Sequence, residues 1–317
     1  MTTQPSMIQA SDVTHYYGPY PAIQDVSFDV RKGEVLGFLG PNGAGKTTTM
    51  RILTGFLPPS RGSVSLDGFD VVEKSLEVRK RVGYLPETVP LYTDMTVTNY
   101  LKYMGTLRGM PPSRIRPRLG EVIDVCRLGD YRKTQIGKLS KGFRQRVGIA
   151  QAIIHEPEVL VLDEPTIGID PIQVVETRNL IQELGRAQTV VLSSHILPEV
   201  SMICERVLII HEGRIVAEDT PQNLADSLQG VERLEVEVAG PSAEVLPVLQ
   251  KIDGVITVSH RNLQGRHTYV IQARPGRDLR DDISRAVISN GWSLRGMQLM
   301  GMSLEEIFLR LTTQEDL

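Results

Sequence analysis

Hydrophobic and polar positions follow two different periods along the first part of the chain. Residues 7–38 alternate as strands do, and they end in an apolar run at residues 34–40. A glycine-rich stretch follows, after which residues 47–56 have the spacing of a helix. Shorter strand patterns recur at residues 64–66 and 82–85. A strand, a loop and a helix in this order predict the opening of an α/β unit.

The middle of the chain changes to helical spacing. Apolar residues from about residue 96 to residue 128 recur every three or four positions, and we expect the prolines at 111, 112 and 117 to break this region into separate helices. Beyond it, a helical pattern at residues 174–184 lies among strand patterns at residues 159–162, 189–193 and 206–211. Strands that alternate with helices predict a parallel, doubly wound sheet with a helical insert.

A change of pattern near residues 221–230 separates the last part of the chain from the rest. We expect a strand, helix, strand, strand, helix and strand there, at residues 234–238, 243–251, 255–260, 267–273, 278–289 and 292–299, and then a last helix from Ser303. This order is typical of a small α+β domain. We therefore predict two domains, residues 1–228 and residues 229–317.

Composition narrows the class of protein. The 317 residues carry 35 Lys plus Arg and 38 Asp plus Glu, a net charge of −3, so we expect no nucleic-acid partner. Cys126 and Cys204 are the only cysteines, and their spacing predicts two reduced, buried thiols. We expect neither a secretory signal nor a spanning helix, since no stretch reaches 18 apolar residues. A role at a membrane would have to come through a partner.

The glycine-rich stretch carries the first chemical motif. It fits GxxxxGK[ST] and consists of Gly40, Pro41, Asn42, Gly43, Ala44, Gly45, Lys46 and Thr47. Glycines in a tight loop let backbone N–H groups point at phosphate oxygens, and the helix that follows turns its positive end toward the anion. Lys46 would reach the β- and γ-phosphates, and the Thr47 hydroxyl can ligate Mg²⁺.

Two carboxylates follow the strand pattern at residues 159–162. The carboxyl ends of parallel strands face the ligand crevice of an open sheet, and Asp163 and Glu164 stand at such an end. Asp163 would hold the Mg²⁺ shell, and Glu164 is placed to polarise an attacking water molecule as general base. Together with the phosphate loop, these residues predict hydrolysis of a nucleotide phosphate.

The order of these motifs resembles a known family. Four elements stand in the order found in the nucleotide-binding subunits of ABC transporters: residues 40–48, residues 139–143, residues 160–170 and His195. The resemblance covers roughly residues 7–225. It implies a P-loop NTPase cassette of α/β class, with a helical subdomain at about residues 89–150 and a phosphate loop that extends to Thr48. It also implies ATP and Mg²⁺ as cofactors and two cassettes that sandwich ATP.

Residues 139–143 occupy the place of the family's LSGGQ signature, which contacts ATP held by the other subunit. Ser140 and Gly142 match that pattern, whereas Lys141 and Phe143 replace a glycine and the glutamine. The resemblance implies that Ser140 and Gly142 bind nucleotide across a dimer. The alternative for Ser140 is an ordinary N-cap of the helix that follows.

Four further positions take their roles from the resemblance. Glu87 stands where the family usually has a glutamine that senses Mg²⁺ and the membrane partner, and a glutamate in a surface turn is the alternative. Asp170 matches a loop that communicates across the dimer, and His195 matches a histidine that contacts the γ-phosphate. Tyr17 matches the aromatic residue that stacks on adenine, with the adjacent Tyr16 as the other possible register.

Residues 302–309 resemble the tail of the daunorubicin-resistance and gliding-motility type of ABC ATPase. Those subunits pair with ABC-2 type permeases and mostly serve export. The resemblance implies an ATPase subunit on the cytoplasmic face of the inner membrane, with a second copy or a homologue beside it. The helical subdomain and the loop around Glu87 would receive a coupling helix of the permease. The amphipathic helix of residues 231–317 would dock on the cassette or on a second subunit, and the alternative is a passive stabilising cap.

Two other functions compete with this interpretation. One is a non-transport ABC ATPase that acts on ribosomes or DNA, although the chain has one cassette and no basic arm. The other is a regulatory nucleotide binder without enzymatic activity, against which the presence of Lys46, Asp163, Glu164 and His195 argues.

Overall fold

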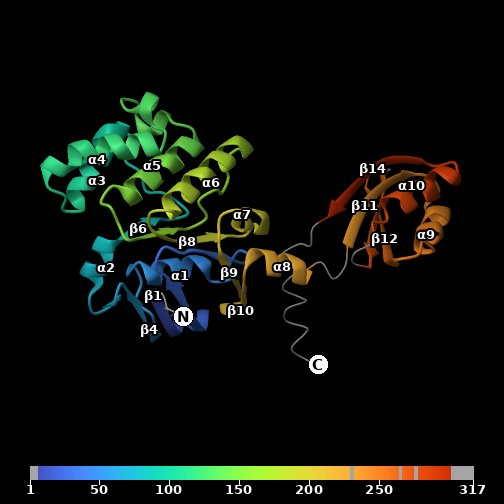
Figure 1. Ribbon diagram of the computed structural model, residues 1–317, viewed down its shortest axis with the longest axis horizontal. Coiled ribbons are helices and arrows are strands. Elements are labelled where there is room, and N and C mark those ends of the chain that lie inside the picture. Colours follow the sequence, from blue (N-terminus) through green and yellow to red (C-terminus); the bar gives the residue numbers. More distant parts are fainter. Residues whose placement is uncertain (1–5, 229–231, 264–265, 275–277, 301–317) are drawn as a thin grey trace. The chain divides into compact units, whose positions relative to one another are not determined.

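The computed structural model describes residues 6–228, 232–263, 266–274 and 278–300. They belong to two compact units, Met1–Pro221 and Gln222–Leu317 (Figure 1). The last helix expected from Ser303, and the tail at residues 302–309, lie outside the described residues.

A six-stranded sheet forms the centre of the first unit (Figure 1). Its order is β10-β9-β3-β8-β7-β6. The strands are β3 (Val35–Leu39), β6 (Val82–Leu85), β7 (Val159–Leu162), β8 (Thr189–Ser194), β9 (Arg206–His211) and β10 (Arg214–Asp219). Every residue of β3, β7 and β8 is buried, as is typical of covered parallel strands. The predicted parallel sheet is thus confirmed, and β10 adds an antiparallel edge strand that the pattern did not predict.

The alternating region at the start of the chain forms a second, antiparallel sheet. Its order is β2-β1-β4-β5, with β1 (Ser6–Tyr17), β2 (Tyr20–Arg31), β4 (Arg61–Leu66) and β5 (Phe69–Asp70). The alternating pattern predicted these strands, but it did not predict that they form a sheet separate from the parallel one. Gly18 and Pro19 alone join β1 to β2, and Gly18 has a φ of 62°. A link this short holds the two strands antiparallel, because a parallel pair needs a long crossover.

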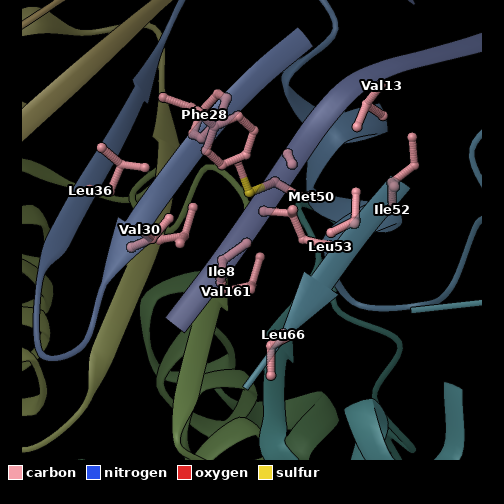
Figure 2. Packing of buried hydrophobic residues seen from close by; sticks show 14 of the residues in the cluster. Ile8, Val13, Phe28, Val30, Leu36, Met50, Ile52, Leu53, Leu66 and Val161 are labelled. Carbon is pink, nitrogen blue, oxygen red and sulfur yellow. The ribbon is translucent and has the colours of Figure 1, made fainter. Parts of the chain in front are cut away.

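Helix α1 (Lys46–Leu53) connects the two sheets through a shared core. Its buried apolar side chains belong to one cluster with residues of both sheets (Figure 2). The cluster includes Met50, Ile52 and Leu53 of α1, Ile8, Phe28 and Val30 of the antiparallel sheet, and Leu36 and Val161 of the central sheet. Burying such side chains is worth about 1.5–3 kcal/mol each. The core therefore fixes the start of α1, and with it the loop that precedes the helix.

Further helices complete the first unit. They are α2 (Ser75–Arg81), α3 (Val97–Leu107), α4 (Pro112–Val125), α5 (Lys141–Ile153), α6 (Pro171–Gly185) and α7 (Leu197–Ser201), with short 3-10 turns η1 (Gly129–Tyr131) and η2 (Ile136–Lys138). Pro111 and Pro112 separate α3 from α4 as expected, but Pro117 lies inside α4. The helix continues past Pro117 because Ile115 and Val122 are buried on its packed face.

The second unit has the predicted order of strands and helices. It contains β11 (Glu232–Ala239), α9 (Ser242–Gln250), β12 (Val255–Leu263), β13 (Arg266–Ala273), α10 (Arg280–Ser289) and β14 (Ser293–Met300), after α8 (Pro221–Leu228). The sheet order is β12-β13-β11-β14, with antiparallel neighbours. Val245 of α9 and Ile283 of α10 share a core with alternate residues of β11 and β13.

Both cysteines are buried and free, as expected, and burial raises the pKa of each thiol. Among the described residues, we find no helix with the length and apolar character needed to span a bilayer.

Fold stability should depend on pH through His155. Its ring lies 3.0 Å from the Val82 carbonyl, and burial, reinforced by the positive charge of Arg108, lowers its pKa from 6.5 to about 4. The unfolded chain therefore binds a proton more readily between these values. The contribution of His155 to the free energy of unfolding should be fully present above pH 6.5. It should be lost as the pH falls toward 4, and the total loss should be about 3 kcal/mol. Urea unfolding between pH 6.5 and 4 should show a smaller loss of unfolding free energy in His155→Gln than in the original protein. If the unfolding free energy depended on pH equally in both proteins, His155 would not be the source of the pH dependence.

Candidate functional site

The phosphate loop lies between β3 and α1, at the carboxyl end of the central sheet. Gly43 and Gly45 have φ values of 82° and 107°, which favour glycine. A β-carbon on Gly45 would lie 2.6 Å from Cγ2 of Ile23 and 2.7 Å from the carbonyl oxygen of Ala22. The motif glycines are thus required by backbone conformation and by close packing against β2. The loop leaves the first N–H groups of α1 available to an anion.

Lys46 is the first residue of α1, and its side chain is only 5% exposed. Its ammonium donates hydrogen bonds to the carbonyl oxygens of Gly40, at 2.7 Å, and Pro41, at 3.1 Å. The same nitrogen lies 3.1 Å from Oε1 of Glu164, whose side chain is 6% exposed. The Lys46 ammonium and the Glu164 carboxylate are thus both nearly inaccessible to water and lie in contact beside the phosphate loop. Water therefore screens their attraction only weakly.

Glu164 and Asp163 follow β7 and are held by the neighbouring strand β8. The N–H of Glu164 donates to the Ser193 hydroxyl at 2.9 Å, and that hydroxyl donates to Oδ1 of Asp163 at 2.6 Å. Glu164 has a φ of 48°, which is rare for a residue with a side chain. His195 completes the cluster, since its Nδ1 lies 2.8 Å from Oε2 of Glu164. When Nδ1 carries the proton, His195 donates to this carboxylate.

Asp163 has the character of a cation ligand. Its Oδ2 is buried without a hydrogen-bond partner among the described residues. Burial raises the pKa of Asp163, and hydrogen bonds with Ser193 and Thr47 oppose that rise. A divalent cation would satisfy the buried oxygen and restore the charged form. The hydroxyl of Thr47 and the carboxylates of Asp163 and Glu87 are oxygen donors of the kind that Mg²⁺ prefers, so the residues present fit this ion.

The phosphate loop and Glu164 border a cavity of about 440 Å³. Its lining consists of Tyr17, Ala22, Asn42, Gly43, Gly45, Lys46, Thr47, Thr48, Glu87 and Glu164. Of the two adjacent tyrosines, it is Tyr17 that lines the cavity, where its exposed ring lies edge-on to His15 at 4.9 Å. The structure therefore brings together an aromatic ring, the phosphate loop and Glu87.

The signature and dimer-loop residues lie outside this cavity. Ser140 caps α5, with its hydroxyl accepting from the N–H of Phe143 at 3.4 Å. Asp170 caps α6 in the same manner, accepting from the N–H of Gln173 at 3.1 Å. A β-carbon on Gly142 would lie 2.7 Å from Oε1 of Gln173, so Gly142 permits the two helix starts to approach. Within one chain, the predicted site residues thus form two separate groups.

Sequence reasoning missed Ser193, which joins Asp163 to the backbone of Glu164. The sequence offers only a weak signal, namely that Ser193 and Ser194 end an otherwise apolar strand pattern at 189–194, and this does not by itself distinguish a functional serine. Parallel strands that lie side by side bring their carboxyl ends together, so a hydroxyl at the end of β8 lies beside the carboxylates after β7.

Comparisons with known proteins agree with this geometry. The family model described as ABC transporter matches residues 23–167. The chain is 30% identical to the linearmycin resistance ATP-binding protein LnrL of Bacillus subtilis (strain 168) over 309 residues, which are 96% of this chain and 98% of that protein. It is 33% identical over 316 residues to the Nod factor export ATP-binding protein I of Paraburkholderia xenovorans, covering 97% of both chains.

A solved structure of an ATP-binding subunit of an ABC transporter matches with a TM-score of 0.63 and 29% identity. The match covers 70% of this chain and 92% of that one. The fold, the geometry of the phosphate loop and the relatives that match nearly the whole chain therefore all indicate the same protein family. The chain belongs to the ABC transporter family, in which it is an ATP-binding protein and an ATPase.

Proposed function

We propose that the chain hydrolyses ATP to power export through a separate membrane permease of ABC-2 type. The observation that carries the catalytic part is the position of the Glu164 carboxylate: it lines the 440 Å³ cavity with Lys46, and it contacts the Lys46 ammonium through one oxygen and the partly exposed His195 ring through the other. Export is supported by relatives that match nearly the whole chain and are named for linearmycin resistance and Nod factor export. Those names describe the relatives.

The residues in and beside the cavity have different roles in binding and hydrolysing ATP. Tyr17 stacks on adenine, and the phosphate loop with Lys46 holds the β- and γ-phosphates. Thr47, Asp163 and Glu87 would hold Mg²⁺, which would neutralise charge on the phosphates. Lys46 pairs with Glu164 in the structure described here, so a bound phosphate competes for the ammonium and frees the Glu164 carboxylate. Glu164 then accepts a proton from the attacking water.

Two chains are needed to complete each ATP site. Ser140, Gly142 and Asp170 lie outside the cavity of their own chain, which supports a role across an interface between two copies. Each ATP would lie between the phosphate loop of one chain and the Ser140 end of α5 of the other. Closure on ATP and reopening after hydrolysis are the mechanical steps passed to the permease.

A second cavity of about 440 Å³ offers a docking place for the permease. It lies where α1 ends and α3 ends, and its lining is Thr54, Gly55, Phe56, Arg79, Val82, Tyr84 and Arg108. Phe56 is 72% exposed there, so its apolar ring is available to a partner. The helical subdomain borders this cavity through Arg108, which supports its use as the groove for a coupling helix. Such docking would hold the chain at the cytoplasmic face of the inner membrane.

His195 should affect turnover more than binding. Replacing it by alanine removes the imidazole that orients Oε2 of Glu164, so we expect kcat to fall about 10²–10³-fold with a small change in KM. Steady-state kinetics with purified protein measure both constants. Substituting the exposed His260 of β12, in the second unit, should leave them unchanged. A normal kcat in the His195 variant would remove this residue from the proposed mechanism.

Copurification from membranes tests the function as a whole. The tagged chain, extracted with detergent and supplied with ATP, should retain a polytopic membrane protein, and reconstitution of the pair should raise ATP turnover. Phe56→Glu should weaken this association severalfold. Ile288→Glu, which alters a side chain 65% exposed in the second unit, should retain it. Recovery with ribosomes and no membrane protein would favour the non-transport alternative and overturn the proposal.

A further inference from the structure

The last residues of β1 are hydrogen-bonded to the loop between α1 and β4. The N–H of Ser60 donates to the carbonyl oxygen of Thr14 at 2.8 Å, and the N–H of Tyr16 donates to the Ser60 hydroxyl at 3.2 Å. The side chain of His15 makes a third link, because its Nδ1 lies 3.1 Å from the carbonyl oxygen of Pro58. Since α1 starts at the phosphate loop, these links fix the end of β1 relative to the helix that carries that loop.

His15 has a defined orientation. Its side chain is buried, with an exposed fraction of 8%. A carbonyl oxygen can only accept a hydrogen bond, so Nδ1 must carry the proton that it donates to Pro58. Burial and this hydrogen bond together hold the imidazole ring in one place on β1.

The ring of Tyr17 lies against this imidazole. His15 and Tyr17 are two positions apart on β1, so their side chains project from the same face of the strand. Their ring centroids are 4.9 Å apart and the ring planes form an angle of 77°, which is the edge-to-face arrangement that aromatic pairs favour. In the part of the chain that the structure describes, no other aromatic ring contacts Tyr17.

Tyr17 has few other restraints. Its side chain is 48% exposed and lines the cavity that the phosphate loop borders. It ends β1, and a β-carbon on the next residue, Gly18, would meet no atom within 4 Å. Its hydroxyl interacts with the exposed Arg51 of α1: burial lowers the pKa of this arginine, and interactions with Tyr17 and Tyr84 raise it above its usual value. An exposed ring can occupy several rotamers, so the imidazole contact favours the one that borders the cavity.

We propose that His15 is a positioning residue, which holds the Tyr17 ring in the orientation that stacks on the base of ATP. This inference rests on the stacking role of Tyr17 under the proposed function and adds the residue that determines where the ring lies. His15 does not line the cavity, so it would act through Tyr17 and would not touch ATP. Its effect should be limited to the base, because the phosphate loop and Lys46 hold the phosphates.

Equilibrium binding to the full-length chain with Mg²⁺ tests this role, with ATP and inorganic triphosphate as the two probes. His15→Asn keeps an N–H donor for the carbonyl oxygen of Pro58 but removes the ring, and it should weaken ATP binding about three- to tenfold. Binding of triphosphate, which has no base, should not change, and this shows that the site is still folded. His15→Phe keeps a ring against Tyr17 and should bind ATP nearly as well as the original protein.

Two tyrosine variants complete the test. Tyr17→Ala should weaken ATP binding about tenfold or more, because it removes the stacking ring. Adding His15→Asn to Tyr17→Ala should cause no further loss, since both residues act through one ring. Tyr16→Ala is the matched control, because adjacent residues of a strand project to opposite faces and Tyr16 does not line the cavity. This variant should bind both probes normally.

The outcomes separate this inference from the proposed function. If Tyr17→Ala left ATP affinity unchanged, the stacking role of Tyr17 would be overturned and the role of His15 with it. If Tyr17→Ala lost ATP affinity and His15→Asn did not, only the role of His15 would be overturned. An equal loss of ATP and triphosphate binding in His15→Asn would overturn it as well, because His15 would not then act through the base. The same conclusion would follow if His15→Phe lost as much ATP affinity as His15→Asn.

Discussion

Glu164→Gln is expected to reduce ATP turnover by about 10²–10⁴-fold while ATP still binds. Glutamine keeps the size of the side chain but cannot accept the proton of the attacking water. The substitution also removes the negative partner of Lys46, so the ammonium becomes freer to engage phosphate. ATP affinity should therefore be equal to or tighter than that of the original protein. Phosphate release and equilibrium binding of ATP measure the two effects separately.

The matched control for this variant is Glu87→Gln. Glu87 lines the same cavity, but no ion pair between it and Lys46 occurs among the described residues. As a proposed Mg²⁺ contact rather than the base, it should shift the Mg²⁺ requirement and reduce kcat less than Glu164→Gln does. If the two variants lost turnover equally at saturating Mg²⁺, the assignment of the base to Glu164 would be untenable.

Lys46→Ala is expected to weaken ATP binding by about 100-fold or more, since it removes a charge-assisted contact to the phosphates in a weakly screened site. Titration calorimetry with ATP and Mg²⁺ measures this loss. Lys74→Ala, at an exposed lysine before α2, is the control and should bind ATP normally. Retained affinity in Lys46→Ala would mean that the phosphates do not lie against this residue.

The same substitution should also destabilise the fold. It leaves the buried Glu164 carboxylate with His195 as its remaining side-chain contact among the described residues, and breaking a buried ion pair from one side costs about 3–5 kcal/mol. Removing the second charge should recover much of this loss, so Lys46→Ala with Glu164→Gln should be more stable than Lys46→Ala alone. Urea unfolding of the two single variants and the double variant forms a double-mutant cycle. If the losses of unfolding free energy were additive, Lys46 and Glu164 would not interact directly.

Much of the fold could be predicted from local pattern. The strand periods at residues 82–85, 159–162 and 206–211 correspond to β6, β7 and β9, and the order of elements in the last unit was also recognised. Two features escaped because they depend on partners rather than on period. The first two strands pair with each other in a separate sheet, and Pro117 stays inside α4 because packing outweighs one lost hydrogen bond.

The residues of the candidate site also divide into those that the local sequence predicts and those that depend on tertiary neighbours. Gly43 and Gly45 are recognisable in sequence because the phosphate loop requires positive φ angles and close packing there. Ser193 is not recognisable by itself, since a serine at a strand end is common and its hydrogen bonds to Asp163 and Glu164 depend on which strand lies beside β7.

The sequence by itself therefore determined the chemistry available to this protein: a phosphate loop, two adjacent carboxylates and a late histidine, each set by local spacing. Only the tertiary structure decided that Lys46 and His195 meet the same carboxylate of Glu164, and that Ser140 and Asp170 stay outside the cavity of their own chain. The physical reason is the range of the forces. Backbone conformation and periodicity act over a few residues, whereas strand order and core packing bring Lys46 to Glu164, more than a hundred positions along the chain, and His195 to the same carboxylate.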